Sequence, residues 1–386
     1  MSEFPISRRR ALSCMAWAGA GIVWSVQGGV PVALGSTQTA TPPKGGLSFV
    51  QISDTHVGFA KDANPDAAAT TALAVERIRS MAVQPQLILH TGDVTHLSKP
   101  PEFDHARALF APISGIEMHV VPGEHDVLDE SPGALFRERF NRGGQGDGWY
   151  SFDHQGVHFI ALVNVIDFAA GGSGHLGEAQ LAWLADDLKR LRDSTPIVVF
   201  THIPLWSVYE PWGWSTSDAA PAMALLKRFG SVTVLNGHIH QVVQKVEGNV
   251  SFFTAMSTAF PQPKPGEGSG PGPLKVPAEQ LRQVLGVRQV TVSAGPAQTI
   301  DQTLASAIID VEQFAFSPAA LTVTKGSSVT WRNKDDTPHN IVASDHSFAS
   351  PAIDGGESYS HSFDKPGTYQ YFCRLHPRMV GSITVT

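Results

Sequence analysis

Seven short apolar runs between residues 46 and 258, most of them ending in Asp or His, constrain the fold of this chain more than any other feature. The runs are LSFVQIS, QLILHTGD, EMHVVPGEHD, VHFIALVN, PIVVFTH, VTVLNGHIH and VSFFTAMS. Amphipathic stretches such as 66–82 and 178–192 lie between several of them. Continuous apolar strands that alternate with helices are typical of sheets covered on both faces, so the pattern predicts an α/β domain.

The polar residues that end these runs are of the types that bind metal ions. They are Asp54, His56, Asp93, His125, Asp126, His202, His238 and His240. Side chains at the carboxyl ends of neighbouring strands meet at one edge of a sheet, and residues two apart leave a strand on the same side. Mixed imidazole and carboxylate ligands suit Fe, Mn, Zn or Co better than Ca or Mg. Two such ions can stabilise the charge on a transferred phosphoryl group.

The order of these residues resembles that of the calcineurin-like metallophosphoesterases over roughly residues 46–260. The shared pattern is Asp54-x-His56, Gly92-Asp93, Gly123-x-His125-Asp126, His202 and Gly237-His238-x-His240. The resemblance implies an α/β (α+β) four-layer sandwich, in which two sheets are flanked by helices, and phosphoester hydrolysis. It also implies a ligand set: Asp54, His56 and His240 on one ion, Asp93 as a bridge, and His202 with His238 on the second ion.

The same resemblance implies that His125 stands beside the leaving or attacking oxygen, with Asp126 orienting its imidazole. Two positions depart from the family pattern. Glu124 replaces an asparagine that normally ligates the second metal. Glu124 could still coordinate, but its charge would favour a more highly charged ion or weaken the attraction of an anionic phosphate. His96 replaces the ligand tyrosine of purple acid phosphatases, which argues against an Fe(III)–tyrosinate centre.

Substrate contacts are signalled only weakly. The segment 209–218 falls where a substrate loop of the family would fall. Trp206, Trp212 and Trp214 would either stack on a base or sugar or pack beneath this loop. The Pro/Gly-rich segment 261–273 predicts an exposed loop.

From Asp310 to the end of the chain, alternating strands are broken by Pro-, Gly- and Asp-rich turns without a helical pattern. Fewer than eighty residues of this kind predict a small β-sandwich or barrel. Cys373, His376 and Met379 follow one another at three-residue intervals in this segment, and His339 lies 34 residues before the cysteine. A thiolate, two imidazoles and a thioether are the ligands of a blue-copper centre. Zinc rarely recruits methionine, so Met379 favours copper over zinc.

This order of ligands resembles the cupredoxin family over 310–386, and the short loop with Pro377 after the histidine is most similar to that of amicyanin and pseudoazurin. The resemblance implies a type 1 (blue) copper ion held by His339, Cys373, His376 and Met379. It also implies electron transfer with a redox partner protein.

The N-terminus predicts export. Arg8, Arg9 and Arg10 precede an apolar stretch that ends near Val26, and small residues follow. The run from Ser7 to Leu12 resembles a twin-arginine signal, which predicts a periplasmic or secreted protein that meets a membrane only during export. The alternative is a retained amphipathic anchor. Cleavage would remove Cys14 and leave Cys373 unpaired, as a copper ligand would be.

We therefore expect three segments: an export signal and linker at 1–40, a metallophosphoesterase domain at 44–300 and a cupredoxin domain at 309–386. Residues 276–308 combine a helical pattern with the strand VRQVTVS and are assigned to the end of the first domain. The formal net charge of −7 and the lack of a basic run in the body of the chain argue against a specific nucleic-acid partner.

The leading hypothesis is an exported binuclear-metal phosphoesterase that hydrolyses phosphomono- or phosphodiesters and carries a copper electron-transfer domain. The alternative is a copper-binding or electron-transfer protein whose hydrolase-like domain is a scaffold or binding module. A narrower hypothesis joins the two domains, with copper setting the oxidation state of an iron in the binuclear site.

Overall fold

The structure, a computed structural model, describes residues 24–27, 30–33, 47–81, 84–141, 143–168, 172–292, 297–304, 307–323, 327–363 and 365–385. The export signal expected at 1–40 lies outside these residues, apart from the antiparallel strands β1 (Trp24–Gln27) and β2 (Val30–Ala33). None of the helices in the described residues is long and apolar enough to cross a membrane.

The first sheet places three sequence-predicted strands side by side. Its spatial order is β13 (Gln298–Thr303), β12 (Gly286–Val292), β3 (Leu47–Ile52), β4 (Leu87–His90) and β5 (Glu117–Val120). Strands β3, β4 and β5 run parallel, whereas β12 pairs antiparallel with β3. The parallel register brings the carboxyl ends of β3, β4 and β5 to the same edge.

The second sheet has six strands. Their spatial order is β10 (Gln244–Glu247), β11 (Val250–Thr254), β9 (Val232–Asn236), β8 (Ile197–Phe200), β7 (Val157–Ala161) and β6 (Tyr150–His154). Strands β7, β8, β9 and β11 run parallel, and the two edge strands are antiparallel to their neighbours. The seven apolar runs of the sequence thus become β3, β4, β5, β7, β8, β9 and β11.

The two sheets pack face to face through large apolar side chains. Phe49 of β3 meets Phe159 of β7 edge-to-face, with ring centroids 5.6 Å apart, and both are fully buried. Leu89, Phe200 and Leu235 belong to the same buried cluster. Because the opposite faces of both sheets are also covered, these strands are apolar throughout rather than alternating.

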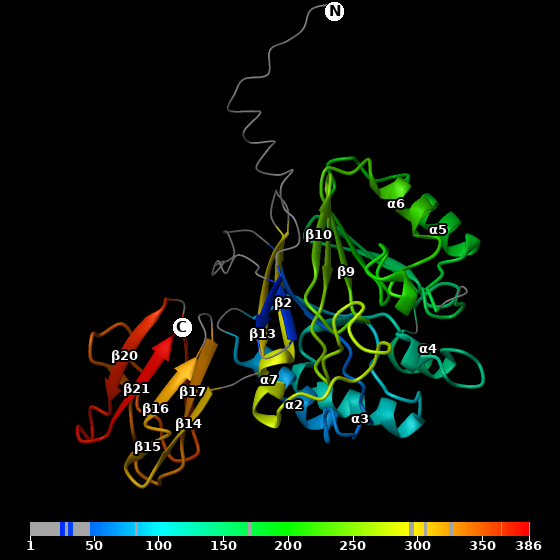
Figure 1. Cartoon of the computed structure of the whole chain (residues 1–386). Coiled ribbons are helices and arrows are strands. Elements are labelled where there is room, and N and C mark those ends of the chain that lie inside the picture. The colour runs from blue at the N-terminus through cyan, green and yellow to red at the C-terminus, as the bar shows by residue number, and fades with distance from the viewer. Residues whose placement is uncertain are drawn as a thin grey trace, which may run out of the picture.

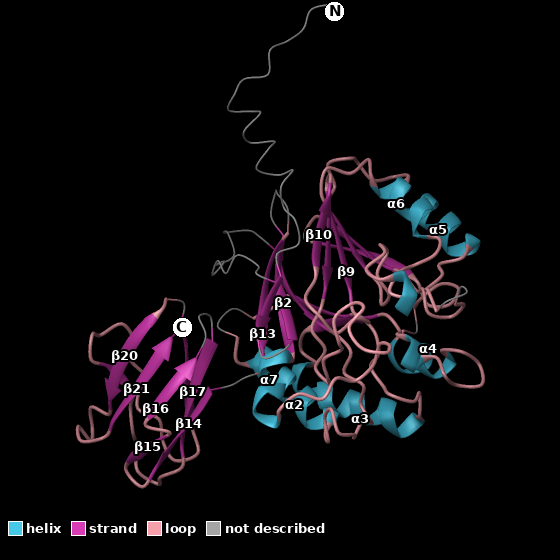
Figure 2. Cartoon of the chain, in the orientation of Figure 1, coloured by secondary structure: helices cyan, strands magenta, loops and turns pink. Residues whose placement is uncertain are grey.

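Helices cover the outer face of each sheet (Figures 1 and 2). The five-stranded sheet is covered by α2 (Ala67–Arg79), α3 (Pro100–Phe110), α4 (Ala134–Phe140) and α7 (Ala278–Val284). The six-stranded sheet is covered by α5 (Glu178–Leu188) and α6 (Ala219–Leu226). Short 3₁₀ turns lie at Ala111–Ile113, Glu124–Asp126 and Glu210–Trp212. The predicted α/β four-layer arrangement of two flanked sheets is confirmed.

The C-terminal strands form a separate all-β sandwich (Figure 1). One sheet has the order β15 (Ala315–Ser317), β14 (Ala307–Glu312), β17 (Ser327–Asn333) and β19 (Ser358–Phe363). The other has the order β16 (Ala320–Val323), β21 (Val380–Val385), β20 (Gly367–Phe372) and β18 (Val342–Ala343). Trp331, Phe363, Tyr371 and Ile383 are buried between them. The small all-β sandwich predicted for the C-terminal part of the chain is confirmed.

Helix α5 is fastened to its sheet by a doubly paired histidine. His158 of β7 lies 2.8 Å from Asp153 through Nδ1 and 2.8 Å from Asp187 of α5 through Nε2. Burial alone would lower the pKa of His158, but the hydrogen bonds and charges of Asp187 and Asp153 outweigh it and raise the pKa. The stabilisation from this raised pKa is complete below the unfolded value of about 6.5 and is lost as pH rises through the folded value.

We therefore expect His158→Asn to destabilise the protein by about 1–3 kcal/mol at mildly acidic pH and by less at alkaline pH. Thermal unfolding of the variant and the wild type across this pH range measures the difference. A gap in stability that stays constant or widens with rising pH would contradict the assignment.

Candidate metal centres

The strand ends deliver the predicted ligands to one edge of the molecule's larger domain. Asp54 and His56 follow β3, Asp93 follows β4, and Glu124 lies in the turn after β5. His202 follows β8, and His238 with His240 follows β9. The edge is shared by both sheets, so ligands from the two halves of the sandwich face each other.

The first cluster combines Asp54, His56, Asp93 and His240, all of them buried. His56 Nε2 lies 3.3 Å from His240 Nε2 and 3.4 Å from Asp93 Oδ2. His240 Nε2 also lies 3.2 Å from Asp54 Oδ1. Four donor atoms thus surround one small space, as the ligands of a metal ion do.

The second cluster combines Glu124, His202 and His238. The Glu124 carboxylate lies between the two rings, with Oε2 at 2.8 Å from His202 Nε2 and Oε1 at 2.9 Å from His238 Nδ1. Asp93 Oδ2 lies 3.4 Å from His202 Nε2 as well as 3.4 Å from His56 Nε2. Asp93 therefore connects the two clusters in the way that a bridging ligand would.

The donor atoms in these clusters fit metal ions better than they fit each other. Four buried polar atoms have no well-formed hydrogen bond within the described residues, and three of them only face one another across the second cluster: Asp54 Oδ2, Glu124 Oε2, His202 Nε2 and His238 Nδ1. Buried polar atoms without partners are costly and call for an explanation. Metal ions held in the two clusters would remove that cost.

Hydrogen bonds on the far side of two rings fix their orientation. His202 Nδ1 donates to the carbonyl of Thr91 at 2.7 Å, and His240 Nδ1 donates to the carbonyl of Phe260 at 2.6 Å. This arrangement directs Nε2 of each ring into its cluster. Such carbonyl partners are typical of metal-binding histidines.

Electrostatics shift the pKa values of two of the ligands, His56 and Glu124. Burial, reinforced by His125, His240 and His96, lowers the pKa of His56 well below its usual value, so the ring is neutral. Burial would raise the pKa of Glu124, but His238 and His202 outweigh it and hold the pKa well below its usual value. Glu124 is therefore an ionised carboxylate, not a protonated substitute for an amide.

The backbone at the ligands is strained. Five ligands have positive φ angles: Asp54 (52°), His56 (39°), Asp93 (54°), His238 (69°) and His240 (53°). Residues other than glycine seldom adopt this left-handed conformation, and where they do so in a cluster the site is often functional. The sequence gives no sign of this strain.

Two glycines allow the ligand turns to approach each other. A Cβ atom at Gly123 would lie 2.1 Å from Asp93 Oδ1, and one at Gly237 would lie 2.5 Å from Asp54 Oδ2. These contacts are too short for any side chain. The glycines in the Gly-x-His and Gly-His patterns therefore make room for the neighbouring carboxylates.

The structure brings His125 to the donor clusters and corrects the role of Asp126. His125 lies beside Asp93 and Glu124. Its Nδ1 donates to the carbonyl of His96 at 2.7 Å, so this carbonyl, and not Asp126, orients the ring. The Asp126 carboxylate instead accepts the backbone N–H groups of Val94, Thr95 and Gly123 at 2.8–3.1 Å. Through these three hydrogen bonds, the carboxylate holds the turn after β4 against the turn after β5.

Sequence reasoning missed His96 as a part of the site. Its ring stacks on His125 with centroids 4.9 Å apart, and its Nδ1 lies 3.4 Å from Nδ1 of His56. Its place three residues after Asp93, where purple acid phosphatases carry a ligand tyrosine, is the signal that could have pointed to it.

Two loop predictions have different outcomes. Trp214 is fully buried and packs with Ile239 and Val243, so it lies beneath the loop and cannot stack on a substrate. The segment 261–273 is exposed only in its later part. Its start is buried, where Gln262 donates from its side chain to the carbonyl of His238 at 2.8 Å. This segment therefore supports a ligand turn.

A separate donor cluster lies in the C-terminal sandwich. Cys373 Sγ lies 3.7 Å from Nδ1 of His339 and 3.7 Å from Nδ1 of His376, and the two nitrogens are 3.2 Å apart. Cys373 is a free, fully buried thiol. Met379 is buried in the same apolar cluster. A thiol and two imidazole nitrogens that converge in this way fit a copper ion.

Hydrogen bonds preorganise this second site. The carboxylate of Asp335 lies 3.0 Å from Nε2 of His339, which leaves Nδ1 to face the thiol. The backbone N–H of Asn340 points to Cys373 Sγ at 3.4 Å. The ligand loop is closed internally, since the N–H of His376 donates to Cys373 O and the N–H of Met379 donates to His376 O.

Comparison with known families assigns each of the two domains to a family. Residues 47–242 match the calcineurin-like phosphoesterases, and residues 304–386 match the copper binding proteins of the plastocyanin/azurin family.

Individual relatives match one part of the chain each. A 3′,5′-cyclic-nucleotide phosphodiesterase of Nostoc sp. is 26% identical over 220 residues, which cover 55% of this chain and 79% of that protein. Amicyanin-alpha of Methylorubrum extorquens is 29% identical over 100 residues, 24% of this chain and 84% of that protein. Plastocyanin of Scenedesmus fuscus is 39% identical over 89 residues, 20% of this chain and 91% of that protein. The chain therefore belongs to the calcineurin-like phosphoesterase family and carries, at its C-terminus, a domain of the plastocyanin/azurin family of copper-binding proteins.

Proposed function

We propose that this protein is an exported binuclear-metal phosphoesterase, acting on phosphomono- or phosphodiesters, with a type 1 copper domain that transfers electrons to or from a partner protein. The observation that carries the proposal is Asp93 Oδ2, which lies 3.4 Å from a histidine of each donor cluster. One carboxylate shared by two donor sets suits a pair of neighbouring metal ions.

The two ion sites follow from the clusters. Asp54, His56, Asp93 and His240 would hold one ion. Glu124, His202 and His238, together with Asp93, would hold the other. Iron, manganese or zinc suits these ligands. When bound, the two ions supply positive charge that stabilises the phosphoryl group during transfer.

His125 is the proton-transfer residue of the proposal. Its backbone N–H donates to Asp93 Oδ1 at 2.9 Å and its Nδ1 donates to the carbonyl of His96, so the ring is held on both sides. Burial would lower the pKa of His125, but Asp93, Glu124 and the His96 carbonyl outweigh it and raise the pKa. The ring can therefore hold a proton on Nε2 and donate it to the leaving oxygen.

The export part of the proposal rests on the arginine-led N-terminal sequence and on the unpaired thiol. A free cysteine is unusual in an oxidising compartment unless it is buried or bound. Cys373 is buried between two imidazoles, which suits a thiol bound to copper.

Asp93→Asn should lower kcat/KM for bis(p-nitrophenyl) phosphate by about a thousandfold or more, because the shared ligand loses its charge. Bound metal should fall as well, and elemental analysis measures it. Asp186→Asn is the matched control, since Asp186 is exposed on α5. Unchanged hydrolysis in Asp93→Asn, or no hydrolysis of any phosphoester by the metal-loaded wild type, would refute the proposed activity. The latter result would favour a scaffold role for the larger domain.

Cys373→Ser should abolish the blue absorption of the copper-loaded protein, because that colour needs the thiolate ligand. Visible spectroscopy checks this, with His346→Asn as a control on an exposed histidine of the same domain. Copper takes no part in the proposed hydrolysis, so the hydrolysis of bis(p-nitrophenyl) phosphate by Cys373→Ser should stay unchanged. A matched loss of turnover would instead support control of hydrolysis by copper.

Glu124→Asn should raise the ratio of kcat/KM for p-nitrophenyl phosphate to that for bis(p-nitrophenyl) phosphate by roughly tenfold. A monoester carries one more negative charge than a diester, and the variant removes a carboxylate beside the substrate. Calorimetric titration of the apoprotein with Mn²⁺ should also show weaker binding of the second ion. An unchanged ratio together with unchanged metal affinity would show that Glu124 is no ligand.

A further inference from the structure

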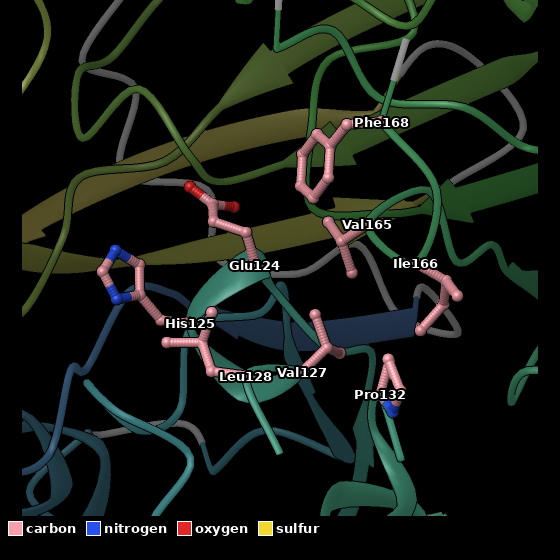
Figure 3. Close-up of a pocket in the computed structure, with 8 residues that line it drawn as sticks. All are labelled: Glu124, His125, Val127, Leu128, Pro132, Val165, Ile166 and Phe168. Carbon is pink, nitrogen blue, oxygen red and sulfur yellow. The ribbon is translucent and has the colours of Figure 1, made fainter. Parts of the chain in front are cut away.

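A pocket of about 270 Å³ opens beside the candidate metal centres (Figure 3). It is lined by Glu124, His125, Val127, Leu128, Pro132, Val165, Ile166 and Phe168. Figure 3 shows two facing walls, one formed by the turn after β5 and one by the segment that carries Val165, Ile166 and Phe168. Since Glu124 and His125 belong both to the pocket and to the donor clusters, whatever fills the pocket touches the reaction centre.

The lining excludes some ligands. Apart from Glu124 and His125 at one end, every lining side chain is apolar, and none is a lysine, arginine, serine or amide. A nucleobase or a sugar placed there would bury polar atoms without hydrogen-bond partners, which is costly. An apolar cavity of about 150 Å³ already binds benzene, so this pocket has room for one aryl ring or a branched alkyl group.

The rim of the pocket carries exposed apolar surface. Leu128 is 58% exposed and Phe168 is 46% exposed, although most large apolar residues described in the larger domain are buried. Large apolar side chains left in contact with water around a cavity mark a binding surface. A ligand that enters the pocket would cover both side chains.

We propose that this pocket binds the apolar alcohol portion of the substrate, so that the enzyme acts on phosphoesters of aryl or branched-alkyl alcohols. This assignment rests on the proposed phosphoesterase function. In the reaction, an oxygen of water forms a new bond to phosphorus while the bond from phosphorus to the alcohol oxygen breaks. The alcohol oxygen takes the proton held at His125 Nε2, and a proton from the water restores the ring. The products are the apolar alcohol and a phosphate with one ester bond fewer.

Phosphinates test the pocket without turnover, because their carbon–phosphorus bonds resist hydrolysis. Diphenylphosphinate and dimethylphosphinate carry the same charge and differ only in the apolar groups. Calorimetry on the metal-loaded full chain should show that diphenylphosphinate binds about tenfold more tightly than dimethylphosphinate. The reason is that a phenyl ring moves from water into the apolar pocket. Leu128→Ser and Phe168→Ser should each remove most of that preference. Both positions are exposed, so the variants should fold. Val246→Ser, at a position that is 42% exposed on β10, should leave the preference unchanged.

Turnover separates this inference from the function on which it rests. A wild type that hydrolyses no phosphoester overturns both. If bis(p-nitrophenyl) phosphate is hydrolysed but the two phosphinates bind equally well, or diphenylphosphinate does not bind, only the pocket assignment is overturned. The same holds if the two pocket variants bind diphenylphosphinate as the wild type does. Lower kcat/KM for bis(p-nitrophenyl) phosphate in both pocket variants, with normal turnover in Val246→Ser, supports the assignment.

Discussion

The constraint on which the larger domain depends is the placement of two buried carboxylates and one half-buried carboxylate at the shared edge of two sheets. Asp54 and Asp93 are almost completely buried, and Glu124 is held between two imidazoles. Isolated buried charges are costly, so each needs nearby donors or cations. The imidazoles, the backbone N–H groups and the proposed ions supply these donors and cations. The packing of the four layers holds these groups at fixed positions.

The residues that the sequence indicated as ligands lie together in the structure, because each one follows an apolar strand that is easily recognised in the sequence. The sequence carried less information about the parts of the site that depend on the path of the connecting turns. The role of Asp126 was wrong because its partners are the N–H groups of Val94, Thr95 and Gly123, whose directions no sequence pattern records. The contact of His96 with His56 and His125 depends on the same turns. The apolar wall at 165–168 carries no motif at all.

Strands at the sheet edges were also missed, for a different reason. β10 is mostly exposed and reads Gln-Lys-Val-Glu, and β13 is similarly polar in sequence. An edge strand need not be apolar, because one side of it has no neighbour and its faces are less covered. The copper-site ligands were easier to predict, since Cys373, His376 and Met379 lie in one short loop. The supporting contact from Asp335 to His339 was not predicted, because a carboxylate in a turn has many other uses.

The left-handed backbone at five ligand positions links metal uptake to folding. Each of these residues holds a conformation that costs free energy, of the order of 1–3 kcal/mol per residue, and the turns that hold it also bring together unpartnered donor atoms. Ions that bind only the folded arrangement offset this cost by an amount that grows with the logarithm of their affinity and concentration. Chelation thus acts on the stability of the domain as well as on its catalysis. The stability of the folded domain should therefore depend on the concentration of free metal ions around it.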